Sequence, residues 1–230
     1  MSVDEIILVG VNVQSTSIFH QVSRGKAMRE NIIKNYYKLI ERLIGPQIHA
    51  FISPNFVSLV ALGSSFAAGI LYASGFFFVG GVVLLLSGFL DTIDGTIARL
   101  TKRSTPFGAL LDSVLDRYAD FFIYAGLLIY YRHQWMFFVI ILAILGSFMV
   151  SYVKARAESL GETRVVGLMQ RPERVLLIVA GSLLTEPASW YDPRYQEIPI
   201  VGVLCFLSIL TNTTALHRLL AAKDDLSHRE

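Results

Sequence analysis

Long stretches without a charged residue dominate the chain after residue 55. Four of them cover residues 56–90, 134–153, 175–185 and 198–216. A helix that crosses a bilayer needs about 20 mostly apolar residues. The second and fourth stretches therefore fit one crossing each, whereas the third is short and the first is long enough to be divided.

The first stretch divides at residues 73–75, which read Ala-Ser-Gly and favour a tight turn. We expect one helix before this turn and a second helix that continues through several aspartates to Leu100. Another helix is predicted from about Pro106 to Tyr131. The sequence thus predicts an all-α integral membrane protein with six transmembrane helices. Residues 185–199 contain three of the seven prolines and are expected to form an outer loop.

Within residues 28–46, apolar and charged residues alternate instead of forming a long charge-free stretch. Residues 28–46 predict an amphipathic juxtamembrane helix on the inner leaflet, because apolar side chains share one broad stripe and charged ones lie on the other face. The apolar stripe comprises Ile32, Ile33, Tyr36, Tyr37, Leu39, Ile40, Leu43 and Ile44. Residues 1–27 lack the basic-then-apolar order of a secretory signal, and we interpret them as a cytoplasmic N-terminal segment of unclear role. Residues 47–230 are expected to form the six-helix domain.

The composition agrees with a membrane protein. Of the 230 residues, 53% are apolar and 17% are charged, and the mean hydropathy is +0.54. Such values are unusual for a soluble domain. The single cysteine, Cys205, excludes an intramolecular disulfide and a cysteine-based metal site.

Basic residues gather on one side of the predicted zigzag of helices. Of the 20 Lys and Arg residues, 17 fall at residues 24–42, 99–103, 154–174 and after Leu216, which this topology places on the same side. Such asymmetry marks the cytoplasmic side. Both termini are therefore predicted in the cytoplasm, in a multi-pass protein of the cell membrane. Because positions at membrane ends explain most of the basic residues, no nucleic-acid partner is expected.

Two pairs of acids interrupt the apolar pattern within predicted membrane helices. Asp91 and Asp94 are three residues apart, and Asp112 and Asp116 are four apart, so each pair shares one helix face. The short connection between the two helices makes them antiparallel neighbours. At a rise of about 1.5 Å per residue, the four carboxylates lie at matching depths, roughly 9–15 Å from the connecting loop.

Four carboxylates at this depth need a cationic partner. An ionised acid at a bilayer centre costs on the order of 2.5 kcal/mol or more, and the four repel one another. Oxygen ligands without nearby Cys or His favour a hard divalent cation, so we expect two Mg²⁺ ions, with Mn²⁺ as the alternative. Pairing with Arg99, Arg103 and Arg117 is the competing explanation. Asp120 continues the same face one turn deeper and is left outside the expected metal site.

The acids belong to a longer pattern of fixed spacing. Over 26 residues the chain reads Asp91-x2-Asp94-Gly95-x2-Ala98-Arg99-x8-Gly108-x3-Asp112-x3-Asp116. This pattern resembles the signature of the CDP-alcohol phosphotransferase family. The resemblance implies a six-helix membrane enzyme, commonly a homodimer, that transfers a phosphatidyl-type group from a CDP-linked lipid to an acceptor alcohol and releases CMP.

The resemblance also implies roles for the residues of the pattern. Asp116 would be both a metal ligand and the catalytic base that removes the acceptor's proton. The metal ligands would be Asp91, Asp94, Asp112 and Asp116. The CDP pocket would include Gly95, Ala98, Arg99 and Gly108. Elementary chemistry agrees with this assignment, because metal ions can clamp a diphosphate and a carboxylate can activate a hydroxyl.

A second group of basic residues indicates the acceptor. The segments "SYVKARAESLG" and "QRPERVLL" place four basic side chains at the cytoplasmic ends of adjacent helices, and arginine suits phosphate binding. These segments are similar to the subgroup of the family that makes phosphatidylinositol phosphate or archaetidylinositol phosphate. The likeness implies that the acceptor phosphate binds Ser151, Lys154, Arg156, Arg171 and Arg174.

Alternatives remain open at this stage. The basic residues could serve only as topology determinants. We expect the acceptor to be a polyol phosphate, inositol 1-phosphate, but glycerol 3-phosphate or another alcohol would also suit a basic pocket. The donor lipid could be based on diacylglycerol or on archaeol. A divalent-cation carrier that uses the same carboxylates is an alternative of a different class, although it leaves the basic cluster without a role.

Overall fold

The computed structural model divides the chain into two units, Met1–Ile52 and Ser53–Glu230. The structure describes residues 54–100, 105–161 and 169–227 of the second unit, without the side chains of residues 54–55 and 93–100. The N-terminal segment at residues 1–27 and the amphipathic helix predicted at 28–46 therefore lie outside the described residues.

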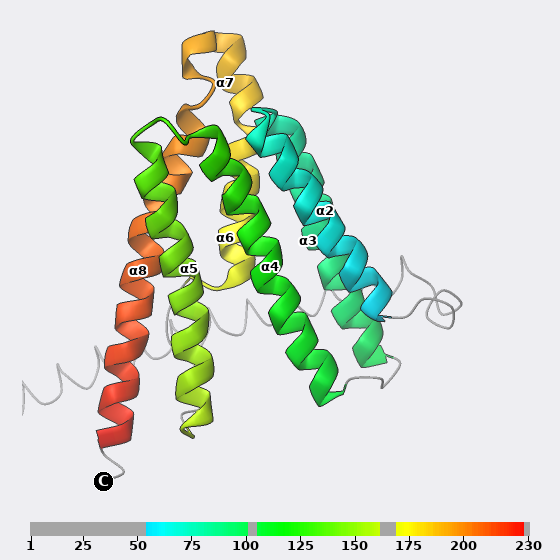
Figure 1. Cartoon of the computed structure of the whole chain (residues 1–230), viewed down its shortest axis with the longest axis vertical. Coiled ribbons are helices and arrows are strands. Elements are labelled where there is room, and N and C mark those ends of the chain that lie inside the picture. The colour runs from blue at the N-terminus through cyan, green and yellow to red at the C-terminus, as the bar shows by residue number, and fades with distance from the viewer. Residues whose placement is uncertain (1–53, 101–104, 162–168, 228–230) are drawn as a thin grey trace, which may run out of the picture. The chain divides into compact units, whose positions relative to one another are not determined.

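The described part of the chain consists of helices and their short connections and contains no strand. Six of the helices are long (Figure 1): α2 (Pro54–Ala73), α3 (Phe77–Leu100), α4 (Pro106–Tyr130), α5 (Met136–Ser159), α6 (Arg171–Leu183) and α8 (Ile198–Ser227). The predicted turn between the first two is present, and Gly75 lies in the left-handed region with φ 82°. The all-α prediction is confirmed for these residues.

Three stretches are long and apolar enough to cross a membrane by themselves. They are Phe56–Ala73, Met136–Ser159 and Pro193–Ser227. In α3 the apolar part is shorter, Phe77–Thr92. These findings agree with a membrane protein, and the number of six crossings stays a prediction.

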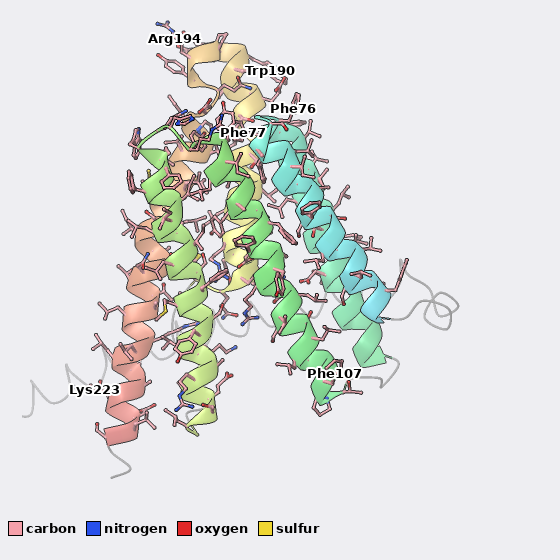
Figure 2. The ribbon with its side chains drawn as sticks, viewed as in Figure 1. Phe76, Phe77, Phe107, Trp190, Arg194 and Lys223 are labelled. Carbon is pink, nitrogen blue, oxygen red and sulfur yellow. The ribbon has the colours of Figure 1, made fainter. Side chains whose placement is uncertain are left out.

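The prediction of an outer loop at residues 185–199 is wrong in detail. A short helix, α7 (Thr185–Tyr191), and a 3₁₀ turn, η1 (Pro193–Tyr195), occupy most of it. Pro187 falls in the first turn of α7, where a missing N–H breaks no bond within the helix. Trp190 and Arg194 from this region lie at the same end of the unit as Phe76, and Phe107 and Lys223 lie at the opposite end (Figure 2).

A cavity lies between α4, α5, α6 and α8. α2 packs along both α3 and α4, and α5 packs along α8. In Figure 1, α4 and α5 diverge from their connection at the α7 end towards their other ends. α6 packs against α3 and α8. Charged side chains described below line this cavity.

Two glycines let α2 and α4 meet at the backbone. A Cβ atom added at Gly126 would lie 2.0 Å from the carbonyl oxygen of Gly69, and one added at Gly69 would lie 2.4 Å from the carbonyl oxygen of Phe122. Small residues at such crossings allow close helix packing in membranes. The contact fixes α4, which carries most of the acids, against α2.

Gly126→Ala is expected to destabilise the protein, because its methyl group has no space between the two backbones. Overpacking of this kind costs about 1–3 kcal/mol. Thermal unfolding of the detergent-solubilised protein measures the effect. The matched control is Gly63→Ala on α2, where a Cβ meets nothing within 4 Å. Equal unfolding temperatures of the two variants would contradict the close contact.

Candidate functional site

Three of the four predicted metal-binding acids come together between α3 and α4. One carboxylate oxygen each of Asp91, Asp112 and Asp116 lies within 4.8 Å of the others. The side chain of Asp94 lies outside the described residues. Oxygen ligands this close can bind one hard divalent ion, so the donor set fits the predicted chemistry. This group is called the acid cluster below.

Arg171, the first residue of α6, binds the acid cluster directly. Its Nη1 atom lies 2.9 Å from Oδ2 of Asp91 and 2.7 Å from Oδ1 of Asp116. Arg117 is less close, with Nη1 4.0 Å from Oδ2 of Asp116. The side chains of Arg99 and Arg103 lie outside the described residues. Among the described residues, the cation closest to these acids is therefore Arg171, which the sequence pattern had assigned to the acceptor phosphate.

Asp120 belongs to the site, although its sequence position had left it without a role. It is buried, and its Oδ1 accepts a hydrogen bond of 3.3 Å from Nε of Arg171. Its Oδ2 accepts one of 2.9 Å from Nη2 of Arg174, which is also buried. The available sequence signal was its spacing, because Asp112, Asp116 and Asp120 follow at intervals of one helical turn.

A polar cavity of about 270 Å³ opens next to these ion pairs, between α4, α5, α6 and α8. We call it the anion cavity because five cationic and three acidic side chains line it, an excess of two positive charges. They are Arg117, Lys154, Arg171, Arg174, Arg218, Asp116, Asp120 and Glu158. One turn beyond Asp120, a hydrogen bond of 3.1 Å between the hydroxyls of Tyr124 and Ser147 joins α4 to α5.

The structure brings four of the five predicted acceptor residues to the anion cavity. They are Ser151, Lys154, Arg171 and Arg174. Arg156 is exposed, does not line the cavity, and donates a bond of 3.3 Å from Nη1 to Oγ of Ser159. The physical reason is the helical period, which turns residues 154 and 156 of α5 to different sides.

Arg218 on α8 is a cavity residue that the sequence did not identify. It is buried, and its Nη1 donates a hydrogen bond of 2.7 Å to the carbonyl oxygen of Val150 on α5. In the sequence it is one of several basic residues near the C-terminus, and no local pattern distinguishes it from Lys223. The cavity wall thus contains Arg218 in addition to Arg117, Arg171 and Arg174.

The predicted CDP pocket falls mostly on undescribed side chains. Gly95, Ala98 and Arg99 belong to the end of α3 where the structure describes the backbone alone. Gly108 lies in the first turn of α4, and its N–H donates a bond of 3.0 Å to Oγ1 of Thr105. Thr105 thus caps the helix that carries Asp112 and Asp116.

Two charged residues connect the acid cluster to the anion cavity. A small second cavity of about 10 Å³ is lined by the three acids, by Arg171 and by residues of α2 and α3. Asp116 and Arg171 line both cavities. A group held at the acid cluster and an anion held in the anion cavity would therefore meet beside Asp116.

An apolar groove of about 500 Å³ adjoins the anion cavity along α4 and α5. Its lining residues are Ser113, Val114, Arg117, Tyr118, Phe121 and Phe148. Ser113 and Arg117 also line the anion cavity. The arrangement can accept a hydrocarbon chain next to a charged head group.

Comparison with known proteins agrees with the chemistry of the site. Residues 51–215 match the model of the CDP-alcohol phosphatidyltransferase family. The archaetidylinositol phosphate synthase of Methanothermobacter thermautotrophicus is 38% identical over 165 residues, which cover 68% of this chain and 80% of that protein. The phosphatidylinositol phosphate synthase of Mycobacteroides abscessus is 29% identical over 189 residues, covering 80% and 84%.

Solved structures share the fold. The phosphatidylinositol phosphate synthase of Mycobacterium tuberculosis in complex with manganese and citrate has a TM-score of 0.69 and 26% identity, covering 81% of this chain and 88% of that one. The same enzyme with CDP-DAG bound has a TM-score of 0.67 and 25% identity, covering 81% and 92%. The manganese complex and the acid cluster are together consistent with divalent metal binding.

Arg171→Met is expected to tighten Mn²⁺ binding. In the wild type, Nη1 of Arg171 shares oxygens of Asp91 and Asp116 that a metal ion would use. Removing this cation should lower the Kd for Mn²⁺ by roughly tenfold or more, because charged hydrogen bonds to two ligands no longer compete. Electron paramagnetic resonance of free Mn²⁺ measures the Kd without turnover.

The control for this measurement is Arg194→Met. Arg194 is a similarly ion-paired arginine, bonded to Asp192 at the α7 end of the unit. Its removal should leave the Kd for Mn²⁺ unchanged. Weaker or equal Mn²⁺ binding by Arg171→Met would show that Arg171 and the metal do not share ligands.

Proposed function

The chain belongs to the CDP-alcohol phosphatidyltransferase family, and from this premise we propose that it transfers a phosphatidyl-type group from a CDP-linked lipid to inositol 1-phosphate, releasing CMP. The observation that carries the choice of acceptor is the anion cavity. Its excess of two positive charges matches a phosphate monoester, which carries about −1.5 to −2 at neutral pH. A neutral alcohol would leave this excess positive charge unneutralised.

The relatives support both substrates. Two of them are named as synthases of archaetidylinositol phosphate and phosphatidylinositol phosphate, whose products contain the proposed acceptor. A solved relative has CDP-DAG bound, which supports a CDP-linked lipid as donor. The hydrocarbon chains of the donor, diacylglycerol or archaeol, would lie along the apolar groove that adjoins the anion cavity.

We assign the chemistry at the head group to Asp116. Because Asp116 lines both cavities, its carboxylate can accept the proton of an acceptor hydroxyl whose phosphate is held in the anion cavity. The hydroxyl oxygen then bonds to the lipid-side phosphorus, the bond from that phosphorus to the oxygen of CMP breaks, and CMP leaves with the electron pair. Arg171, Arg174 and Lys154 orient the acceptor through its phosphate.

Asp91, Asp112 and Asp116, with Asp94, would hold the divalent ions expected in this family. When bound, Mg²⁺ or Mn²⁺ would neutralise the diphosphate of the donor and stabilise the departing CMP. The carboxylates contribute the ligand oxygens, and the hydrogen bonds of Arg171 to two of them offset part of the negative charge of the cluster.

We further propose that α2, α3, α4, α5, α6 and α8 each cross the cell membrane, with both termini and the anion cavity on the cytoplasmic side. The three long apolar stretches and the bias of the basic residues support this topology. A homodimer, common in the family, is part of the same proposal.

The purified protein in detergent micelles or nanodiscs, supplied with Mg²⁺, CDP-diacylglycerol or CDP-archaeol and labelled inositol 1-phosphate, is expected to form a labelled phospholipid and one CMP per turnover. Lipid extraction and CMP release measure the two products. Parallel reactions with glycerol 3-phosphate and free inositol should be much slower, because neither combines the phosphate with the inositol ring.

Other outcomes separate the alternatives. Preferred turnover of glycerol 3-phosphate would keep the family chemistry and replace the acceptor. No turnover with any phosphorylated or neutral alcohol, together with Mg²⁺ flux into liposomes that contain the protein, would favour the divalent-cation carrier.

Asp116→Asn is expected to lower kcat by about 100- to 10,000-fold, the usual contribution of a general base. The amide keeps the size of the side chain and cannot accept the proton. The variant should still bind the CDP-lipid, and equilibrium binding of a labelled CDP-lipid measures this. Asp224→Asn, at an exposed position near the end of α8, is the matched control. Near-normal kcat in Asp116→Asn would exclude Asp116 as the base.

A further inference from the structure

Asp120 connects the arginines of the anion cavity to the row of acids on α4. Its two oxygens accept hydrogen bonds from two different arginines, 3.3 Å to Nε of Arg171 and 2.9 Å to Nη2 of Arg174. The residue is 5% exposed and Arg174 is 3% exposed. All three side chains line the anion cavity. Asp120 is therefore a buried counter-ion for two cations that face the same space.

The hydrogen bond to Asp120 uses only one nitrogen of the Arg174 guanidinium, Nη2. Its Nε and Nη1 atoms are buried and have no hydrogen-bond partner among the described residues. Buried charged groups with unmade hydrogen bonds are unfavourable, so their persistence needs a reason. An anion in the cavity would accept from these donors while Asp120 keeps Nη2.

From these contacts we propose that Asp120 is a positioning residue: it holds Arg171 and Arg174 in the orientation in which they bind the phosphate of the acceptor. This inference rests on the proposed function. It assigns Asp120 a role different from that of Asp116, which lies one turn away on the same helix face. Asp120 acts through the arginines and touches neither substrate.

The geometry separates this role from metal binding. The acid cluster comprises Asp91, Asp112 and Asp116, and Asp120 is not part of it. Both oxygens of Asp120 accept hydrogen bonds from arginines, whereas Arg171 contacts one oxygen each of Asp91 and Asp116. Loss of Asp120 should consequently disturb the acceptor more than the metal ion.

The test is Asp120→Asn, which keeps the shape of the side chain and removes its charge. We expect the KM for inositol 1-phosphate to rise by roughly tenfold or more, as charged hydrogen bonds to both arginines are weakened. The KM for the CDP-lipid should stay unchanged, and the Kd for Mn²⁺ should change by less than the KM for the acceptor. Asp120→Glu, which restores the carboxylate, should recover part of the acceptor affinity. Asp192→Asn, the same change in an arginine-paired acid at the α7 end, is the matched control.

Two results would overturn the proposal. An unchanged acceptor KM in Asp120→Asn would remove Asp120 from the acceptor site. A large loss of Mn²⁺ affinity would make it a metal ligand instead. A purely structural role predicts equal effects on donor and acceptor, and it too would overturn the assignment.

A second variant covers the case in which Asp120→Asn does not fold because Arg174 loses its counter-ion. Asp120→Asn combined with Arg174→Gln removes both charges of that pair. Its acceptor KM should exceed that of Arg174→Gln alone, because Arg171 also loses a partner. Equal KM values in the two variants would overturn the positioning of Arg171.

A binding measurement separates failure of this inference from failure of the proposed function. If the wild type shows no turnover with inositol 1-phosphate, the function fails first. Inorganic phosphate can still be titrated, and its binding is measured as the rise in thermal unfolding temperature. A roughly tenfold higher half-saturating phosphate concentration in Asp120→Asn would support the positioning role. An unchanged concentration would refute it.

Discussion

The ion pairs of Arg171 are the interaction on which the rest of the site depends. One guanidinium from α6 bonds to Asp91 on α3 and to Asp116 and Asp120 on α4. Carboxylates in apolar surroundings are costly unless a cation lies next to them, and leaving one partner of a buried pair alone costs about 3–5 kcal/mol. Arg171 thus allows a helical bundle built from apolar stretches to keep several acids close together. It also ties α6 to helices that are distant in the sequence.

The packing of the helices explains why this charge balance can occur in one place. Backbone contact at Gly69 and Gly126 holds α2 against α4, and α2 also packs along α3, so that Asp91 faces the acids of α4. α4 and α5 remain joined near the α7 end, where the hydroxyls of Tyr124 and Ser147 meet, and separate beyond it. The anion cavity lies between α4, α5, α6 and α8. Apolar packing near the α7 end therefore holds the helices in the arrangement that leaves the anion cavity between them.

Much of this could be predicted from the sequence, because it depends on local spacing. The helix bounds follow from the apolar stretches, and Asp91, Asp112 and Asp116 meet because short periodic segments form an antiparallel pair. The contact of Arg171 with Asp91 joins residues 80 positions apart, and no local pattern indicates which face of α6 meets the acids. Arg218 was missed for the same reason. The helical period could have separated Arg156 from Lys154, but both were treated as charges at a helix end.

The position of the acids within the fold also distinguishes the two classes of function. A carrier must expose its ion site to both sides of the membrane in turn, whereas a transferase needs access from one side. Beyond Asp120, the next buried hydrophobic side chains of α4 are those of Ile123, Tyr124 and Leu127, each at most 1% exposed and part of the main apolar core. Along the described part of α4, this core separates the acids from the α7 end, so passage of an ion would require opening part of the apolar core. The basic cavity on the open side has no use in a pathway for cations, since its positive charge would repel them. A transferase that binds an anionic acceptor needs both the access from one side and the basic cavity.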